Sequence, residues 1–364
     1  MEKPYLGIIY SRRRWKRVPK AKGKLKKQLK YIEQAGRRNG VKPCFVRLSY
    51  ITPGQKTIKA YVKEKEGYIL TEIPCPAVFY NRIVDWPKRR KKIEKLLAEG
   101  KVIFNVRNYD YGKYPIWKLL AENSEIAVHL PDTKRATVKN INKMMKLYDQ
   151  LILKPNLGEV GKGVMSLVKQ GEQWQLSYKD KDKNWTNIHF KKNLPDFLKD
   201  RIKKYFYLVQ ERIPLEKHEG EPFDIRVVVQ RNKTGNWETT AFIGKVAHKG
   251  RLITNITQGG YSIPLEHILG DHPYLSSDGT VSKISNFAIK TAEYLSTRLP
   301  HIGDLGMDIG ITADGTPFFI EVNYLSDYET LSFRKDKLIT RKWKRIYMTP
   351  IEYGAYLLQQ QENS

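Results

Sequence analysis

Two acidic side chains near the C-terminal end of the sequence are spaced so that they could bind a divalent cation together. The segment GMDIGITADGTPFFIEVN, residues 306–323, contains Asp314-Gly315, a pair that favours a two-residue type I′ turn. Such a turn places Asp308 directly opposite Glu321, and Asn323 lies two residues further along on the same face. Oxygen ligands without sulfur or imidazole are typical of Mg²⁺ sites. The hairpin therefore predicts a magnesium-binding face.

The same two carboxylates should be unfavourable when no cation is bound. Directly opposed carboxylates repel each other in a sheet. Asp308 and Glu321 also lie among apolar residues such as Met307 and Val322, where desolvation of a charge is costly. The alternative is an exposed polar face without a metal. The opposed pair is the strongest chemical signal in the sequence.

A lysine followed by three glycines could bind phosphate. In LILKPNLGEVGKGV, residues 151–164, an apolar strand ends near Lys154, and Gly158, Gly161 and Gly163 follow it. Glycine lets backbone N–H groups approach phosphate oxygens, and lysine supplies a mobile positive charge. The segment matches neither a P-loop nor a Rossmann fingerprint, because a strand and not a helix follows the glycines. An ordinary hairpin turn is the alternative.

Two further segments could complete a binding site. In FDIRVVVQ, residues 223–230, Asp224 and Arg226 fall on one face of a strand and apolar side chains fall on the other. Arg226 is either a structural partner of Asp224 or a clamp for a developing anion. YLVQERIPL, residues 207–215, offers backbone groups and an apolar wall that suit a purine, but it can equally be an ordinary strand end.

The first part of the chain predicts a small parallel α/β domain that covers residues 1–110. Short apolar strands alternate there with helical patterns, which is the arrangement of such domains. The strands are expected at 5–10, 44–48, 76–80 and 101–105, and the helices around 34–38 and at 88–97.

The rest of the chain, residues 111–364, predicts a second domain of α+β class. Asp132 or Thr133 should cap a helix over 134–148. A second helix is expected at 281–298, before the acidic hairpin. The strands are expected at 151–155, 164–169, 174–178, 205–211, 223–230, 237–246, 305–312 and 317–323.

Composition excludes several classes of protein and indicates an anionic partner. The 364 residues include 66 Lys and Arg against 38 Asp and Glu, a net charge of +28, and 40% of them are hydrophobic, enough for a sizeable core. Two cysteines exclude a disulfide framework and a thiolate zinc site. No apolar run is long enough for a membrane span or a signal peptide, so a cytoplasmic protein is expected. The segment from Arg12 to Lys30 carries eleven positive charges and no negative charge.

The order of these motifs resembles the ATP-grasp superfamily, and in particular its endospore coat-associated YheC/YheD type. The lysine strand comes first, followed by the glycine loop, the two central strands and the acidic hairpin. The matching segments are LPDT, LILKP, GEVGKGV, VQERIPL, EPFDIRVVVQ, ITNITQGG at 253–260, LGMDIGI and FFIEVN. The resemblance implies two α+β subdomains that grip ATP, preceded by a small pre-ATP-grasp α/β domain.

The resemblance also implies roles for individual residues towards the nucleotide. Lys154 would contact the α- and β-phosphates, and Lys134, with Arg135 as the alternative, would be the second phosphate-binding residue. The loop over the β- and γ-phosphates would comprise Gly158, Gly161, Lys162 and Gly163. The adenine slot would be lined by Gln210, Glu211 and Ile213, the last two through their backbone groups.

The remaining implied roles concern metal binding and catalysis. The Mg²⁺ ligands would be Asp308, Glu321 and Asn323. Arg226 would stabilise the transferred phosphoryl group or the tetrahedral intermediate. Lys245 stands where related sequences often have arginine, and Asn255 would be a polar contact near the γ-phosphate.

The implied activity is that of an ATP-dependent carboxylate–amine ligase that acts through an acylphosphate and forms ADP. ATP and Mg²⁺ are the expected cofactors, and an acidic or peptidic substrate is expected because of the basic surface. A competing hypothesis is a basic nucleic-acid-binding protein, which would use the Arg12–Lys30 segment with Trp15. A third hypothesis is a spore-coat component with a vestigial ATP site, but the intact Lys154, Asp308, Glu321 and Asn323 argue against it. A kinase on the same fold is a further alternative. Spore association accompanies the expected cytoplasmic location.

Overall fold

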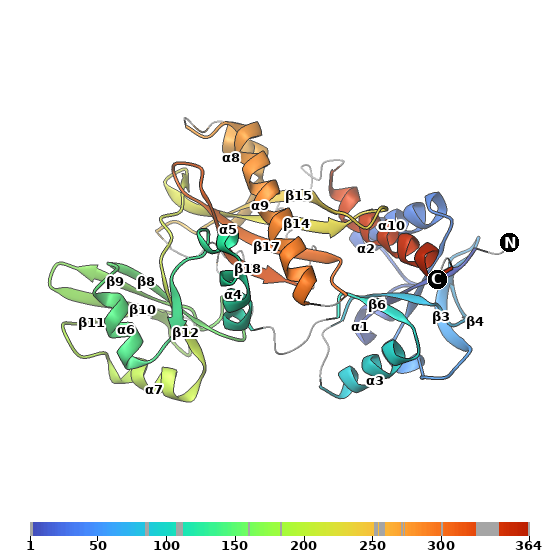
Figure 1. Cartoon of the computed structure of the whole chain (residues 1–364), viewed down its shortest axis with the longest axis horizontal. Helices are drawn as coiled ribbons and strands as arrows, with labels where there is room; N and C mark the ends of the chain where they lie inside the picture. Colours follow the sequence, from blue (N-terminus) through green and yellow to red (C-terminus); the bar gives the residue numbers. More distant parts are fainter. Residues whose placement is uncertain are drawn as a thin grey trace.

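The computed structural model describes residues 3–83, 87–106, 112–158, 161–182, 184–250, 254, 259–270, 272, 274–299, 301–324 and 342–362. These residues form three sheets, which we call sheet A, sheet B and the central sheet. Sheet A, at the N-terminal end of the chain, and sheet B lie on opposite sides of the central sheet (Figure 1). Among the described helices, none has the length and apolar character that a membrane span requires.

Sheet A confirms the parallel α/β prediction for the first part of the chain. β1 pairs in parallel with β2 and β5, and β5 pairs in parallel with β6. The antiparallel β3–β4 hairpin extends the sheet beyond the prediction. In the order β4-β3-β2-β1-β5-β6, the strands are β1 (Tyr5–Ile9), β2 (Lys42–Val46), β3 (Thr57–Lys63), β4 (Tyr68–Pro74), β5 (Val78–Asn81) and β6 (Val102–Phe104).

Helices cover both faces of sheet A. The 3₁₀ turn η1 (Leu48–Tyr50) follows β2, and the helices are α1 (Arg12–Trp15), α2 (Gly23–Arg38), α3 (Pro87–Ala98) and α10 (Lys342–Glu362). Leu29 of α2 and Ile351 of α10 share one buried cluster with β1. Ile93 of α3 belongs to the cluster on the other face. The last helix of the chain therefore packs on the first domain (Figure 1).

Sheet B is antiparallel and carries two helices on one face. Its strands, in the order β11-β10-β9-β8-β12-β7, are β7 (Thr133–Arg135), β8 (Gln150–Pro155), β9 (Met165–Gln170), β10 (Gln173–Lys179), β11 (Trp185–Phe190) and β12 (Tyr207–Glu211). The helices are α6 (Val138–Met145) and α7 (Asp196–Lys204). Ile141 of α6 and Leu198 of α7 pack against Leu151 and Leu153 of β8.

The predicted helix over 134–148 is wrong at its start. Residues 133–135 form β7, which pairs with β12, and the helix begins only at Val138. Thr137 is the N-cap, and its hydroxyl accepts a hydrogen bond from the Asn140 N–H at 3.1 Å. A threonine further along the chain thus satisfies the free N–H groups of the helix, and the preceding residues complete the edge of the sheet.

The central sheet is antiparallel and packs one face on a long helix. Its strands are β13 (Lys217–His218), β14 (Glu221–Arg231), β15 (Trp237–Val246), β16 (Tyr261–Pro264), β17 (Asp304–Ile311) and β18 (Pro317–Asn323). The helices on its apolar face are α4 (Lys113–Ala121), α5 (Ser124–Ala127), α8 (Leu265–Gly270) and α9 (Ser277–Arg298). Ile225 and Val227 pack towards α9 as the strand alternation predicts, so Asp224 and Arg226 face the opposite side.

The β17–β18 hairpin has the predicted pairing but not the predicted turn. Asp308 pairs with Glu321, as expected. The loop has three residues, because Thr312 pairs with Thr316, and Gly315 has a φ of +78°. The turn alone would shift the pairing by one residue, and a bulge between Asp308 and Ile309 restores it. The predicted two-residue turn is therefore wrong. The predicted pairing of Asp308 with Glu321 is nevertheless correct, because the bulge offsets the extra loop residue.

Candidate active site

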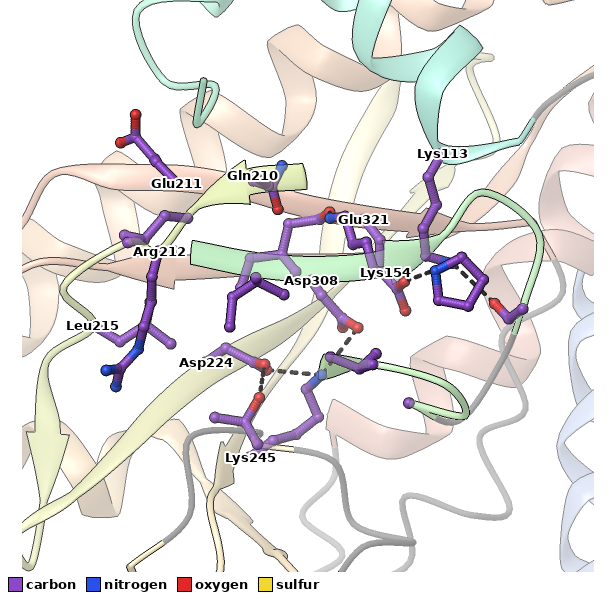
Figure 2. A pocket seen from close by; sticks show the side chains of 18 of the residues that line it. Lys113, Lys154, Gln210, Glu211, Arg212, Leu215, Asp224, Lys245, Asp308 and Glu321 are labelled. Atoms are coloured by element: carbon purple, nitrogen blue, oxygen red, sulfur yellow. Dashed lines mark hydrogen bonds and ion pairs between the residues drawn. The ribbon is translucent and has the colours of Figure 1, made fainter. Parts of the chain in front are cut away.

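A cleft lies between sheet B and the polar face of the central sheet. Side chains from both sheets and from the start of α4 point into it (Figure 2). The charged or amide side chains that line it are Lys113, Lys154, Lys162, Gln210, Glu211, Arg212, Asp224, Lys245, Asp308 and Glu321. Most of the residues predicted from the sequence therefore converge on one cavity.

Strand alternation in β8 delivers a lysine to the cleft. Leu151 and Leu153 belong to the buried cluster beneath α6 and α7. Ile152 and Lys154 project from the other face and line the cleft. One face of β8 thus anchors the sheet, and the other presents Lys154.

Lys154 is almost completely buried, with 8% of its surface exposed. Its Nζ donates a hydrogen bond to the Ile320 carbonyl at 3.3 Å. Burial, together with the nearby Lys113, lowers the pKa of Lys154 to about 8, although Glu321 acts in the opposite direction. Such a desolvated cation is stabilised by an anion, and phosphate oxygens are suitable partners.

Lys113 is a residue of the cleft that the motifs in the sequence do not reveal. Its Nζ lies 3.2 Å from a Glu321 carboxylate oxygen and donates to the Gly158 carbonyl at 2.9 Å. Asn156 fixes the start of α4, because its backbone carbonyl and side-chain oxygen accept hydrogen bonds from the N–H groups of Lys113 and Tyr114. The position of Lys113 directly after Gly112, at the start of a helix, is the sequence feature that could have pointed to this residue.

Lys134, the residue preferred for the second phosphate contact, lies elsewhere. It is on β7, where its Nζ pairs with Asp132 at 3.1 Å, and it is not among the residues that line the cleft. Arg135, the alternative, is also absent from the lining, and its guanidinium lies 5.1 Å from the Phe206 ring centroid. Among the described residues, the lysines that do line the cleft beside Lys154 are Lys113 and Lys162.

Asp308 lies in a buried ionic network. Arg226 binds its carboxylate through two nitrogens, with Nη2 at 3.0 Å, and the Nζ of Lys245 lies 2.9 Å away. Burial alone would raise the pKa of Asp308, but the two cations outweigh burial and hold the pKa well below its usual range. Arg226 therefore has Asp308, not Asp224, as its ionic partner.

Lys245 joins Asp308 to Asp224 (Figure 2). Its Nζ lies 2.7 Å from Asp224, and the hydroxyl of Thr254 also donates to Asp224. Burial opposes the charge on Lys245, but the two carboxylates raise its pKa above the ordinary value. Desolvation raises the pKa of Asp224 to about 6, in spite of Lys245.

The predicted magnesium ligands supply oxygen donors. Asp308 and Glu321 are paired across the hairpin, yet each carboxylate has its own cationic partner. Asn323 is not among the residues that line the cleft, and its Nδ2 atom is buried without a hydrogen-bond partner among the described residues. Two carboxylates and one amide suit Mg²⁺. Within the described ranges no group of three or more His, Cys, Asp or Glu side chains could hold a metal ion, so the predicted site has two carboxylates only.

The glycine loop borders the cleft only in part. Gly158, Gly161 and Lys162 line it, whereas Gly163 does not. Gly163 has a φ of +75°, and a Cβ there would lie 2.8 Å from the Tyr207 hydroxyl, which donates to the Gly163 carbonyl. Gly163 therefore closes the loop against β12. Asn255 lies outside the described residues.

The predicted purine slot also lines the cleft. Gln210, Glu211 and Ile213 border it, and the Gln210 amide donates to Thr133 at 2.7 Å. The Glu211 N–H donates to the Asp132 carbonyl at 2.9 Å. These three residues thus form one wall of the cleft beside Lys154.

Comparison with known proteins gives a family match for most of the chain. The model for YheC/D-like ATP-grasp proteins matches residues 101–357. The endospore coat-associated protein YheD of Bacillus subtilis (strain 168) is 25% identical over 330 residues, which cover 86% of this chain and 70% of YheD. The endospore coat-associated protein YheC of the same organism is 22% identical, over 85% of this chain and 86% of YheC.

Solved structures share the fold at low sequence identity. The ATP-grasp ligase PsnB complexed with precursor peptide PsnA2 and AMPPNP superposes with a TM-score of 0.53 at 14% identity, over 99% of both chains. PsnB complexed with a phosphomimetic variant of a minimal precursor, Mg and ADP gives a TM-score of 0.51 at 13% identity, again over 99% of both chains.

Proposed function

The chain belongs to the YheC/D-like ATP-grasp family, and we propose that its cleft binds ATP with Mg²⁺ and ligates a carboxylate to an amine. The observation that carries this proposal is the placement of two lysines, Lys113 and Lys154, beside the paired carboxylates Asp308 and Glu321. Cations for phosphate and oxygen ligands for a metal thus border one cleft.

The nucleotide would lie along sheet B. Lys113 and Lys154 would bind the phosphates, with Lys162 and the glycine loop closing over them. Phosphate binding would cost Lys154 little, because the hydrogen bond it would give up goes to a backbone carbonyl and is the only one its Nζ donates among the described residues. Gln210, Glu211 and Ile213 would hold the adenine at the other end of the cleft.

A magnesium ion would be held by Asp308, Glu321 and Asn323. When bound, it would neutralise the charge of the nucleotide phosphates. Lys113 and Lys245, which now pair with these carboxylates, would remain beside it as further positive charges.

The reaction would proceed in two balanced steps. An oxygen of the donor carboxylate attacks the γ-phosphorus of ATP, the bond to the β-phosphate oxygen breaks, and ADP leaves. The amine then attacks the acyl carbon of the acylphosphate, phosphate departs with the donor oxygen, and the amine loses a proton. Positioning and charge neutralisation suffice for such chemistry, so no protein nucleophile is required.

Arg226 and Lys245 would supply positive charge at the reacting phosphoryl group. Both are fixed by Asp308, Arg226 through two contacts, which keeps their charged groups oriented before the reaction. We also propose Asn255, whose side chain is uncharged, as a polar contact near the γ-phosphate.

The remaining features fit a ligase made of two domains. Residues 1–110 would form the substrate-docking domain and residues 111–364 the ATP-grasp domain, whose last helix returns to the first. An acidic or peptidic substrate suits the net charge of +28. Because the curated relatives are endospore coat-associated, we also propose an association with the spore, after synthesis in the cytoplasm.

Nucleotide binding tests the proposal. Mg-ATP at millimolar concentration should raise the melting temperature of the protein, because a ligand of the native state stabilises it. Lys113→Ala should remove most of this shift, whereas Lys134→Ala, a matched change outside the cleft, should retain it. Absence of any shift in the unaltered protein, or an equal loss in both variants, would contradict the proposed site.

A further inference from the structure

Two of the parallel strands of sheet A, β2 and β5, are followed directly by arginine. Arg47 follows β2 directly and Arg82 follows β5 directly, while Arg12 comes shortly after the end of β1. Parallel strands end at the same edge of a sheet, and this carboxyl edge is where open α/β sheets bind their ligands. The edge therefore gathers guanidinium groups at the position where a ligand is expected.

The register places Arg47 and Arg82 level with each other. Ile9 of β1 pairs with Val46 of β2 on one side and with Asn81 of β5 on the other. Arg47 and Arg82 each follow one of these partners directly, so their backbones lie at the same level along the sheet. The intervening residue is Tyr10, and the guanidinium of Arg14 lies 4.8 Å from its ring centroid. With strands about 4.8 Å apart, Arg47 and Arg82 start about 10 Å from each other.

The arginines of this edge differ in their partners among the described residues. The Arg47 guanidinium lies 5.0 Å from the Tyr50 ring centroid and 5.8 Å from that of Trp15. Within the described residues neither Arg47 nor Arg12 forms an ion pair, and Arg82 pairs with Asp304 at 3.2 Å. Aromatic rings thus orient the charge of Arg47 and leave it without a neutralising carboxylate.

This edge adjoins the proposed catalytic end of the central sheet. Asn105, the residue after β6, donates hydrogen bonds to the carbonyls of Asp304 at 2.7 Å and Tyr324 at 3.1 Å. Tyr324 directly follows β18, which carries Glu321 and Asn323. The arginines therefore begin at β5, one strand away from Asn105, and extend across β1 to β2, away from the central sheet.

We infer that this edge is a subsite for the acyl donor and that the donor carries several carboxylates, such as a glutamate-rich peptide. The inference rests on the proposed ligase function. Guanidinium groups bind carboxylates through two parallel hydrogen bonds, which lysine cannot do. From Asn105 after β6 to Arg47 after β2 the edge spans three strand spacings, about 14 Å, and an extended peptide of about four residues covers that length.

A binding experiment with synthetic peptides tests this subsite. Tetraglutamate and tetraglutamine are titrated into the full-length protein, with and without Mg-AMPPNP. Arg47→Gln should weaken tetraglutamate binding about tenfold, the loss expected for one charged hydrogen-bonded contact. Arg47→Lys, which keeps the charge but loses the planar group, should give an intermediate loss.

A matched control lies at the opposite edge of the sheet. Arg38 ends α2, shortly before β2 begins, so Arg38→Gln makes the same charge change at the amino edge. It should leave tetraglutamate binding within about twofold of the unaltered protein. Arg12→Gln provides a second test that does not endanger the fold, because Arg12 is exposed, and it should weaken binding about two- to threefold.

The outcomes separate this inference from the proposed function. Equal binding of tetraglutamine, equal losses in the Arg47 and Arg38 variants, or tighter Arg47-dependent binding of a single-stranded oligonucleotide would overturn the subsite. Failure of Mg-AMPPNP to bind the unaltered protein would contradict the proposed function alone, because tetraglutamate binding is also measured without nucleotide. Selective loss of tetraglutamate binding in Arg47→Gln would support the subsite.

Discussion

Lys154 and Asp308 are both buried ionisable residues of the cleft, but their surroundings disfavour the charged form of Lys154 and favour that of Asp308. Lys154 forms no ion pair among the described residues, so burial and the nearby Lys113 lower its pKa in spite of Glu321. Asp308 has two cationic partners, so its pKa falls although burial opposes the charge. The apo protein therefore tolerates Lys154 at a cost in stability and depends on the charge of Asp308.

The stability of the protein should depend on pH through Lys154. Its pKa falls from 10.5 to about 8 on folding, so between these values the unfolded chain retains a proton that the folded protein has released. Stability rises with pH wherever the unfolded state binds more protons. The free energy of unfolding should thus increase between about pH 8 and 10.5, and Lys154→Met should be more stable at pH 7 by up to about 3 kcal/mol. Urea unfolding of both proteins across this range measures the effect, and parallel curves would contradict it.

The two proposed metal ligands should differ in their contribution to the apo fold. Removing the charge in Asp308→Asn leaves Arg226 buried without its ionic partner, while Lys245 keeps Asp224, and we expect a loss of about 3–5 kcal/mol. Glu321→Gln breaks a partly exposed pair with Lys113, a loss below about 1 kcal/mol. Chemical denaturation without Mg²⁺ compares them. If Asp308→Asn is as stable as the original protein, this prediction is wrong. The expectation from the sequence, that removing one carboxylate relieves its repulsion with Glu321, would then hold.

At the scale of elements, the alternation of apolar and polar residues was sufficient to predict the strands and their faces. It was not sufficient to predict the turns and the short helices. The predicted faces of β14 and the pairing of Asp308 with Glu321 agree with the structure. The turn at Gly315 and the bulge that compensates for it depend on tertiary packing, which residue spacing does not encode. No helix is predicted from the sequence at α4, whose Pro115 lies in the first turn, where proline is tolerated. Lys113, the first residue of α4, was missed with it.

The three-residue turn predicts a specific sensitivity at Gly315. Its φ of +78° is unfavourable for any residue with a Cβ, so Gly315→Ala should destabilise the protein by about 1 kcal/mol. Gly270→Ala is the control, because Gly270 ends α8 without a positive φ and has open space around its Cβ position. Thermal unfolding of the two variants distinguishes them, and equal stability would argue against this turn.

At the scale of the whole molecule, the C-terminal helix joins the two domains. Ile351 and Leu358 of α10 pack in the core of sheet A, while Trp343 and Ile346 pack on Val228 and its neighbours in the central sheet. Sequence order gives no indication of this return, because sheet B and the central sheet lie between sheet A and α10 in the sequence. The predicted boundary at residue 110 stays a prediction, and the core of the first domain includes a helix from the end of the chain.

This arrangement predicts that changes in α10 destabilise the distant N-terminal domain. Ile351 is fully buried, so Ile351→Ala should lower the free energy of unfolding by about 2–5 kcal/mol. The exposed Gln359 serves as the control, and Gln359→Ala should have little effect. Hydrogen exchange should show increased opening of β1 and α2 in Ile351→Ala, and exchange confined to α10 would contradict the proposed coupling.

The central claim is that this chain is an ATP-dependent ligase whose cleft carries the reaction. The most direct measurement incubates the purified protein with Mg-ATP and pools of amino acids and acidic peptides, and follows ADP together with new amide masses. We predict that ADP and an amide product accumulate in equal amounts, that both require Mg²⁺, and that Asp308→Asn and Glu321→Gln abolish both. ADP formation without an amide, or turnover at the original rate in either variant, would contradict this claim.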